Sequence, residues 1–296
     1  MQRFTVVLIV LFFVQIFANA LVFLNEPETR LSLEWHQTQF KISVFQPFVH
    51  PVVPIDWLLP KENRDLLKGL VSVESNFYVH ALSVEGAMGL AQFVPSTAEK
   101  LGVLNPFNAF WAMDGANRYL EQLQRQFKSI EYALAGYFEG PSKIAKYGPS
   151  SAAIEYARKV LRSAERLKGE TIFVKDVTYI EPYVLVGDRF ALGLNVYASF
   201  LGTSYLSGGI QLDDWKKLSH RVLFYPAITH SFSLIVGERN FNFTVGALYR
   251  KMPNFGVQFL LDSNNLDLEA LLRVWKFYIT TGFSLKGFRV GLIGGM

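Results

Sequence analysis

The chain has 296 residues, 50% hydrophobic and 18% charged, which excludes a mainly disordered protein and is long enough for two domains. The net charge of +4 comes from scattered basic residues, without the Lys/Arg blocks or interleaved basic and aromatic residues typical of nucleic-acid binding. No cysteine is present, which excludes disulfides and thiolate metal sites, and the five histidines lack metal-ligand spacing. We therefore expect neither a metal nor a cofactor.

The N-terminus has the features of an export signal. Arg3 precedes an apolar run over residues 4–17, and Ala18-Asn19-Ala20 has the small-x-small form of a signal-peptidase site. We expect residues 1–20 to be a cleaved signal peptide of an exported protein. An uncleaved anchor is the alternative, because apolar residues resume at 21–24 and extend the run to about the 20 residues that span a bilayer.

Residues 21–60 are rich in Pro, Phe and Val and lack a helical period, which predicts a short strand-rich segment. From 61 to 169 the apolar residues recur every three or four positions, which predicts an all-helical domain. One helix is expected to begin at Ser96, where Ser96 and Glu99 have the spacing of a capping box. The other four helices are predicted from stripes at Leu66-Leu67-Leu70-Val71, Ala112-Ala116-Tyr119-Leu120-Leu123-Phe127, Ala133-Leu134-Tyr137-Phe138 and Ile154-Ala157-Leu161-Ala164.

Residues 170–296 change to a period of two, for example from Phe190 to Phe200 and from Phe241 to Tyr249. Turn signals separate these runs, and about eight antiparallel strands fit, enough to close a small barrel. The fold class predicted is therefore α+β, a helical domain followed by an antiparallel β domain. An outer-membrane barrel is slightly favoured over a soluble β domain. Interfacial girdles would then come from Tyr183, Tyr197, Tyr205, Tyr225, Tyr249, Trp275 and Tyr278.

Glu74 is the candidate for chemistry. It follows Leu70 by four positions and Val71 by three, so it lies on the apolar face of its helix and points inward. Burial of a carboxyl group favours the protonated form, as a general acid requires near neutral pH. A solvated surface glutamate is the alternative interpretation from position alone.

The sequence around Glu74 resembles the transglycosylase SLT family. The resemblance is carried by Glu74-Ser75-Asn76-Phe77, by residues 81–83 and 86–98, and by ordered blocks at 105–108, 115–120, 135–141 and 156–160. It implies a goose-lysozyme-like fold and cleavage of the β-1,4 bond between N-acetylmuramic acid and N-acetylglucosamine in peptidoglycan glycan strands. The product expected from the family carries a 1,6-anhydro-muramic acid end.

The resemblance also assigns roles to individual residues. It implies that Glu74 is the catalytic acid, that Ser83 and Gln92 bind substrate, and that Tyr137 helps to position Glu74 and the sugar. Without it, Ser83 and Gln92 could serve only a turn or backbone groups, and Tyr137 could be a core residue. Gly86 and Gly89 are interpreted as backbone requirements.

The chain departs from the family pattern at Phe138, where asparagine is usual, and at Glu139, where a small residue is common. Two alternative functions follow from the sequence. A muramidase would cut the same bond with water and a second carboxylate, for which Glu85, Asp114 and Glu139 are the candidates. A noncatalytic envelope protein would only bind peptidoglycan. The expected location is the periplasm or cell envelope, with possible outer-membrane association through residues 170–296.

Overall fold

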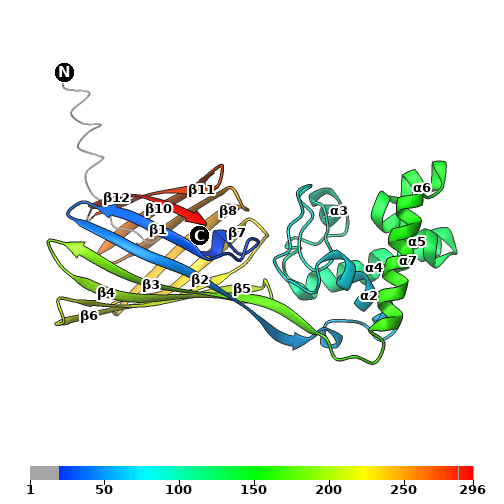
Figure 1. Cartoon of the computed structure of the whole chain (residues 1–296), viewed down its shortest axis with the longest axis horizontal. Coiled ribbons are helices and arrows are strands. Elements are labelled where there is room, and N and C mark those ends of the chain that lie inside the picture. The colour runs from blue at the N-terminus through cyan, green and yellow to red at the C-terminus, as the bar shows by residue number, and fades with distance from the viewer. Residues whose placement is uncertain (1–19, 286, 296) are drawn as a thin grey trace, which may run out of the picture. The chain divides into compact units, whose positions relative to one another are not determined.

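The computed structural model of the protein describes residues 20–285 and 287–295 (Figure 1). The predicted signal peptide falls on residues 1–19 and so lies outside the described residues, apart from Ala20. The chain divides into two compact units. One contains the described residues up to His50 and those from Val177 onward, and the other is Pro51–Asp176. Within the described ranges, no helix has both the length and the apolar character needed to cross a membrane.

The first unit is an antiparallel barrel. Its strands within the described residues are β1 (Arg30–His36), β2 (Gln39–Pro54), β3 (Phe173–Gly187), β4 (Ala191–Phe200), β5 (Ser204–Asp213), β6 (Lys217–Pro226), β7 (Phe232–Arg239), β8 (Asn242–Lys251), β9 (Phe255–Asp262), β10 (Asn265–Val274), β11 (Phe277–Ser284) and β12 (Gly287–Gly295). Each strand neighbours the next in the chain, and β1 pairs with β12 to close the barrel.

The predicted fold class is therefore wrong in two respects. The described residues form a closed barrel of twelve strands instead of about eight. The helical region does not precede the whole β part, because it is inserted between β2 and β3. The strand count was too low because β1 and β2 come before the helices and because glycines such as Gly208 and Gly209 interrupt the alternation in β5. In this barrel β1 and β2 lie between β12 and β3, so without them β3 and β12 would be open edges.

The direction of the strands determines where the helical region is inserted. Arg30, at the start of β1, pairs with Gly295 at the end of β12 and with Phe45 in β2. Since neighbouring strands are antiparallel, β2 ends and β3 begins at the same rim of the barrel as the start of β1 and the end of β12. The chain therefore leaves and re-enters the barrel at this rim, which we call the insertion rim.

The two faces of the barrel wall carry opposite kinds of side chain. Outward positions are apolar along whole strands, as in β10, where Leu266, Leu268 and Leu272 are 40–49% exposed. Inward positions on the same strand include the buried carboxylates Asp267 and Glu269. Buried polar side chains of the barrel include Arg30, Ser32, Glu34, Lys41, Ser43, Glu181, Asn195, Ser199, Ser207, Arg221, Ser233, Thr244, Arg250, Gln258, Thr280, Ser284 and Arg289. The barrel is thus polar inside and apolar outside.

Most of the tyrosines predicted to form interfacial girdles on the outside point into the barrel instead. Tyr183, Tyr197, Tyr205, Tyr225 and Tyr278 are at most 4% exposed and belong to the interior. Successive residues of a strand alternate between the two faces, so a shift of one position moves a side chain from outside to inside. Of the seven predicted girdle residues, Tyr249 is exposed on the outside of β8, and Trp275 is exposed in the turn between β10 and β11.

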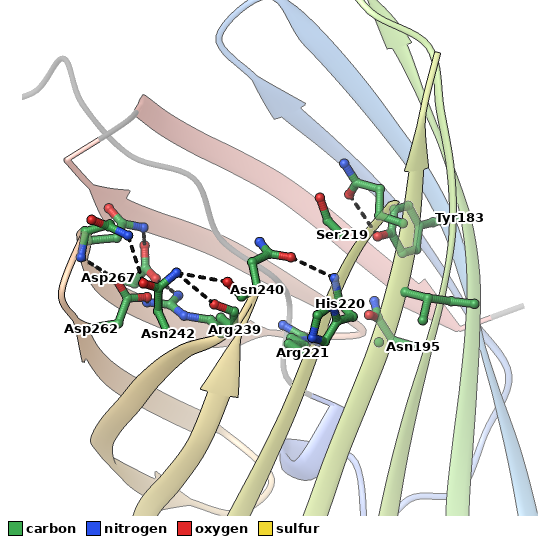
Figure 2. Close-up of a pocket in the computed structure, with 15 residues that line it drawn as sticks. Tyr183, Asn195, Ser219, His220, Arg221, Arg239, Asn240, Asn242, Asp262 and Asp267 are labelled. Carbon is green, nitrogen blue, oxygen red and sulfur yellow. Dashed lines mark hydrogen bonds and ion pairs between the residues drawn. The ribbon is translucent and has the colours of Figure 1, made fainter. Parts of the chain in front are cut away.

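Several charged groups of the interior form ion pairs across strands. Lys41 forms an ion pair with Glu181, and Arg289 with Glu34. Near the rim opposite the insertion rim, Arg239 bonds both Asp267 and Asp262, the latter at 2.6 Å, next to a cluster of asparagines (Figure 2). Buried charges are tolerated when they are paired and hydrogen-bonded.

An apolar segment fills part of the interior. Leu21, Val22, Phe23 and Leu24 are at most 1% exposed. The Phe23 ring contacts inward-facing aromatic rings of three strands, at centroid distances of 5.6 Å to Phe45, 6.4 Å to Tyr179 and 4.9 Å to Tyr278. The Tyr179 hydroxyl donates a 2.8 Å hydrogen bond to the Phe23 carbonyl. We call residues 21–24 the plug segment.

The second unit, all of whose residues are described, contains six α-helices, five in the predicted regions and one, over Pro141–Tyr147, that was not predicted. They are α2 (Arg64–Glu74), α3 (Pro95–Lys100), α4 (Ala109–Phe127), α5 (Ile130–Glu139), α6 (Pro141–Tyr147) and α7 (Ser151–Arg166). The predicted capping box at Ser96 is wrong, because α3 begins at Pro95 and Val94 is its N-cap without a side-chain hydrogen bond. Proline at the first helical position is preorganised for helix and lacks the N–H that a cap would satisfy.

Candidate active site

Glu74 is the last residue of α2, and the residue after it fixes the position of the helix end. The Ser75 hydroxyl lies 3.2 Å from the Val71 carbonyl of the same helix and 3.0 Å from the Leu90 carbonyl. Asn76 and Phe77 then take positive φ angles of 50° and 64°, so the chain turns sharply away. The Glu-Ser pair therefore ends the helix and attaches its end to the loop that follows.

The residues predicted for the site lie around one cleft. A cavity of about 480 Å³ is lined by all four predicted site residues, Glu74, Ser83, Gln92 and Tyr137. The remaining lining residues are Glu85, Ala87, Phe93, Val94, Thr97, Tyr119, Phe138, Glu139 and Gly140. The volume falls within the range of small-molecule sites, which are mostly apolar clefts with few polar groups.

The protonation of Glu74 is shifted by its surroundings. Burial raises the pKa of Glu74 from 4.5 to about 7 and outweighs two effects that lower it, the hydrogen bond donated by Tyr156 and the positive charge of Lys159. A carboxyl group with a pKa near neutrality is protonated in a large fraction of molecules at physiological pH. Glu74 is therefore able to give and take back a proton.

Tyr156 is a site residue that the sequence reasoning did not assign. Its hydroxyl donates a hydrogen bond to Glu74 Oε1 from α7, and its side chain is buried. Burial and the nearby charge of Glu74 raise the pKa of Tyr156 well above 10.0, so the phenol remains a donor. Tyr156 belongs to the block 156–160 that carried the family resemblance. Its position among Ala153, Ala157 and Val160 on the buried face of α7 is the other signal.

Ser83 and Gln92 hold together a loop that lines the cleft with Glu74. Ser83 Oγ accepts a 3.1 Å hydrogen bond from the Ala87 amide. Gln92 Nε2 donates to the carbonyls of Ala81 and Gly89 at 3.1 and 2.9 Å. Both side chains thus shape the loop as well as lining the cleft, and the substrate contacts predicted for them stay predictions.

Gly89 is required by the backbone of this loop. It has a φ of 75°, and a Cβ atom built at this position would lie 1.9 Å from the Pro106 carbonyl oxygen. No side chain fits there, because the left-handed conformation and the close approach both favour glycine. Gly86 also has a positive φ of 81°, but open space surrounds its missing Cβ.

Tyr137 lies beside Glu74 without forming the hydrogen bond to it. Its hydroxyl donates a 2.8 Å hydrogen bond to the Ala91 carbonyl. Its ring packs against Tyr119 and Phe93, at centroid distances of 5.3 and 6.1 Å. The hydrogen bond to Glu74 comes instead from Tyr156, so any effect of Tyr137 on the acid must come from packing, charge or substrate.

The three candidates for a second catalytic carboxylate have different surroundings. Glu139 lines the cleft, but its oxygens accept hydrogen bonds from Ser150 Oγ at 2.7 Å and Lys143 Nζ at 2.9 Å. These contacts lower the pKa of Glu139. Glu85 lines the cleft on an exposed turn. Asp114 is exposed, bonds Arg118 at 2.9 Å and is absent from the cleft lining.

Comparison with known proteins shows what the helical unit is similar to. Residues 60–159 match the family model described as "Transglycosylase SLT domain". A curated relative, a transglycosylase of Enterobacteria phage PRD1, is 30% identical over 106 residues. That alignment covers 36% of this chain and 39% of the phage protein, so the chain spans about two fifths of its relative's length.

Two solved structures are similar over the same share of the chain. The soluble lytic transglycosylase SLT70 of Escherichia coli is 17% identical with a TM-score of 0.32, covering 36% of this chain and 22% of that one. An inactive mutant of lytic transglycosylase Slt from Pseudomonas aeruginosa is 22% identical with a TM-score of 0.31, covering 38% and 23%. The helical region inserted in the barrel is thus similar in sequence to the transglycosylase SLT domain, and we call it the SLT domain below.

Proposed function

We propose that the protein is a peptidoglycan lytic transglycosylase that cuts the β-1,4 bond between N-acetylmuramic acid and N-acetylglucosamine. The observation that carries this proposal is Glu74, a half-buried carboxyl group with a pKa of about 7 at the wall of the cleft of an SLT domain. Ser83, Gln92 and Tyr137 surround it, as expected for the substrate-binding residues of the family.

In the proposed reaction, the protonated Glu74 donates its proton to the glycosidic oxygen, and the bond from that oxygen to C1 of the muramoyl residue breaks. The C6 hydroxyl of the same residue attacks C1 and closes the 1,6-anhydro ring. The Glu74 carboxylate then takes the proton of that hydroxyl, which restores the acid. Tyr156 acts throughout as a donor that holds the Glu74 oxygen in place.

The carboxylates around the cleft favour this lyase over a muramidase. Inverting and retaining hydrolases use two flanking carboxyl groups. Glu139 is engaged by Ser150 and Lys143, Asp114 lies outside the cleft lining, and Glu85 lies in the lining on an exposed turn. An intramolecular nucleophile needs no second carboxylate.

The catalytic proposal is tested by incubating purified full-length protein and its Glu74→Gln variant with peptidoglycan sacculi and following the loss of turbidity. Clearance by the wild type and none by the variant supports catalysis by Glu74. Equal clearance by both would overturn the assignment of Glu74. A wild type that binds sacculi without clearing them would favour the noncatalytic binding protein.

We further propose that the barrel anchors the enzyme in the outer membrane. A wall with apolar residues outside and paired charges inside is the pattern of membrane barrels, in which lipid-facing and lumen-facing residues alternate. Most strands have 8–10 residues, close to the 9–11 needed to cross a bilayer at a tilt. Because the substrate is the cell wall, the insertion rim would face the wall.

The anchoring proposal is tested by folding the full chain in detergent, exchanging it into phospholipid vesicles and floating these on a density gradient containing urea. Protein that floats with the vesicles supports insertion, because a peripheral protein is stripped by urea. Protein recovered at the bottom would contradict the membrane anchor and leave the catalytic proposal untouched.

A further inference from the structure

Phe138 stands between the cleft and the tyrosine that holds the catalytic acid. It follows Tyr137 near the end of α5, and its ring stacks on that of Tyr156 with centroids 4.7 Å apart and planes inclined by 17°. Tyr156 in turn donates its hydrogen bond to Glu74. One face of the Phe138 ring is therefore covered by an aromatic neighbour in direct contact with the acid.

The rest of the Phe138 ring is open. The residue is 52% exposed and lines the same cleft as Glu74. Single exposed apolar side chains are common and need no explanation by themselves. This one is distinguished by its place, because it lies in the wall of a cleft next to the reacting group. Its neighbours Tyr137 and Tyr156 are largely covered by protein.

The charge of the cleft limits what can lie against this ring. The ionisable side chains that line the cavity are the carboxyl groups of Glu74, Glu85 and Glu139 and the tyrosines Tyr119 and Tyr137, with no lysine or arginine among the lining residues of the described chain. An anionic group would meet carboxyl groups there, since Lys143 and Lys159, which act on Glu139 and Glu74, are not part of the lining. A neutral ring with one apolar face suits the site better, since the π-face of phenylalanine accepts C–H groups at van der Waals distance.

We propose that Phe138 is a substrate-binding platform, on which a pyranose ring of the glycan strand stacks beside the bond to be cut. This inference rests on the proposed function and adds to it a contact that determines specificity. Pyranoses present axial C–H groups on one face and hydroxyl groups at the edge. The edge would meet the polar groups of the cleft while the C–H face lies on Phe138. The platform is held in place from behind by Tyr156.

A purely structural role for Phe138 predicts different kinetic changes from a role as a platform. If the ring served only to hold Tyr156, its replacement would disturb the hydrogen bond to Glu74 and change kcat and its dependence on pH. Loss of a platform instead raises KM and leaves the pH dependence of kcat in place. Phe138→Leu separates the two, because leucine keeps apolar volume over Tyr156 but has no flat aromatic face. Phe138→Trp retains the platform.

The experiment measures kcat and KM of the full chain on soluble glycan strands of defined length for the wild type, Phe138→Leu and Phe138→Trp. We expect Phe138→Leu to raise KM about threefold to tenfold, the effect of one aromatic contact, with kcat and its pH profile kept. Phe138→Trp is expected to stay within about twofold of the wild type, well inside the energy of that contact.

The binding step is measured separately in the inactive background. Glu74→Gln and the double variant Glu74→Gln/Phe138→Leu are titrated with the same strands, and the double variant is expected to bind about threefold to tenfold more weakly. An unchanged Kd and KM in Phe138→Leu, with an active wild type, would overturn the platform alone. A wild type inactive on all strands would instead overturn the proposed function. If Phe138→Leu fails to fold, the test uses Phe138→Trp and compares how KM depends on strand length. The same dependence as in the wild type supports the platform. A different dependence contradicts it.

Discussion

The SLT domain and the barrel bury opposite kinds of side chain within one chain. The SLT domain buries apolar residues such as Leu67, Leu70 and Leu120 and places a carboxyl group, Glu74, at the edge of that core. The barrel exposes apolar residues and buries charges such as Lys41 and Arg289 inside. The difference is what two solvents would require if, as we propose, the barrel lies in a membrane, with water around the helices and lipid around the strands.

Buried ionisable groups also differ between the two units in whether they have an ion-pair partner. In the barrel, Lys41 and Glu181 neutralise each other, as do Arg289 and Glu34, so interior charge contributes to structure. In the SLT domain, Glu74 accepts a hydrogen bond from the neutral hydroxyl of Tyr156, and burial raises its pKa to about 7, so both its protonated and its ionised forms are populated near neutral pH. Burial with an ion-pair partner keeps a group charged, whereas burial without one favours the neutral, protonated form of a carboxyl group.

The largest expected effect is on catalysis and is confined to the SLT domain. Glu74→Gln keeps the size of the side chain but cannot transfer a proton, so the rate of glycan cleavage should fall by about 10²–10⁴-fold. Initial rates on soluble glycan strands measure this. Glu85→Gln, on the same cleft, is the matched control and should cleave at close to the wild-type rate. A comparable loss in both variants would point to a two-carboxylate mechanism.

The next effect concerns the interior of the barrel. Phe23→Ala removes the central ring of the plug segment and should destabilise the barrel by about 3–5 kcal/mol, the cost of a large core truncation. Denaturant unfolding of the vesicle-inserted protein, followed by the mobility of folded and unfolded forms on a gel, measures it. Phe277→Ala, which removes an outward-facing ring, is the control. Equal losses would show that the plug segment contributes nothing specific.

A smaller effect is expected on the outside of the barrel. Leu268→Arg places a charge on the outward side of β10 and, if that side faces lipid as we propose, should cost about 2–4 kcal/mol of stability in the membrane, near the midplane value for such a change. The yield of floating protein in the vesicle experiment reports it. Leu285→Arg, in the hairpin after β11, should insert normally. If both arginine variants insert equally well, the outward face does not contact lipid.

The smallest expected effect is a shift in pH dependence. Because Glu74 must be protonated to act, kcat/KM should be high below its pKa of about 7 and fall as the pH rises through that value. Tyr156→Phe removes a hydrogen bond that lowers the pKa of Glu74, so the fall should move to higher pH. A shift to lower pH would mean that Tyr156 does not stabilise the carboxylate. Rates measured from pH 5 to 9 decide between them.

The helices and the cleft were accessible from the sequence because their signals are local. The apolar stripes of α2, α4, α5 and α7 follow the helical period, and the ordered motif blocks placed Glu74, Ser83, Gln92 and Tyr137 together. The contact of Tyr156 with Glu74 joins residues 82 positions apart. Sequence alone gives no direct sign of where a buried hydroxyl finds its acceptor.

The barrel was less predictable because its closure depends on distant pairings. β1 meets β12 across almost the whole chain, and β2 and β3 are neighbours although the SLT domain separates them in sequence. Inward-facing tyrosines such as Tyr205 and Tyr225 are the same residue type that forms interfacial girdles, so residue type alone does not tell them apart. Only the register distinguishes them, and a register error of one residue inverts the assignment.

The most direct test of the catalytic proposal is the mass of the muropeptides that the full-length protein releases from sacculi. We predict fragments ending in 1,6-anhydro-muramic acid, each lighter by one water molecule than the corresponding hydrolysis product. Fragments with reducing muramoyl ends would contradict the intramolecular attack and require water activated by a second group in the cleft.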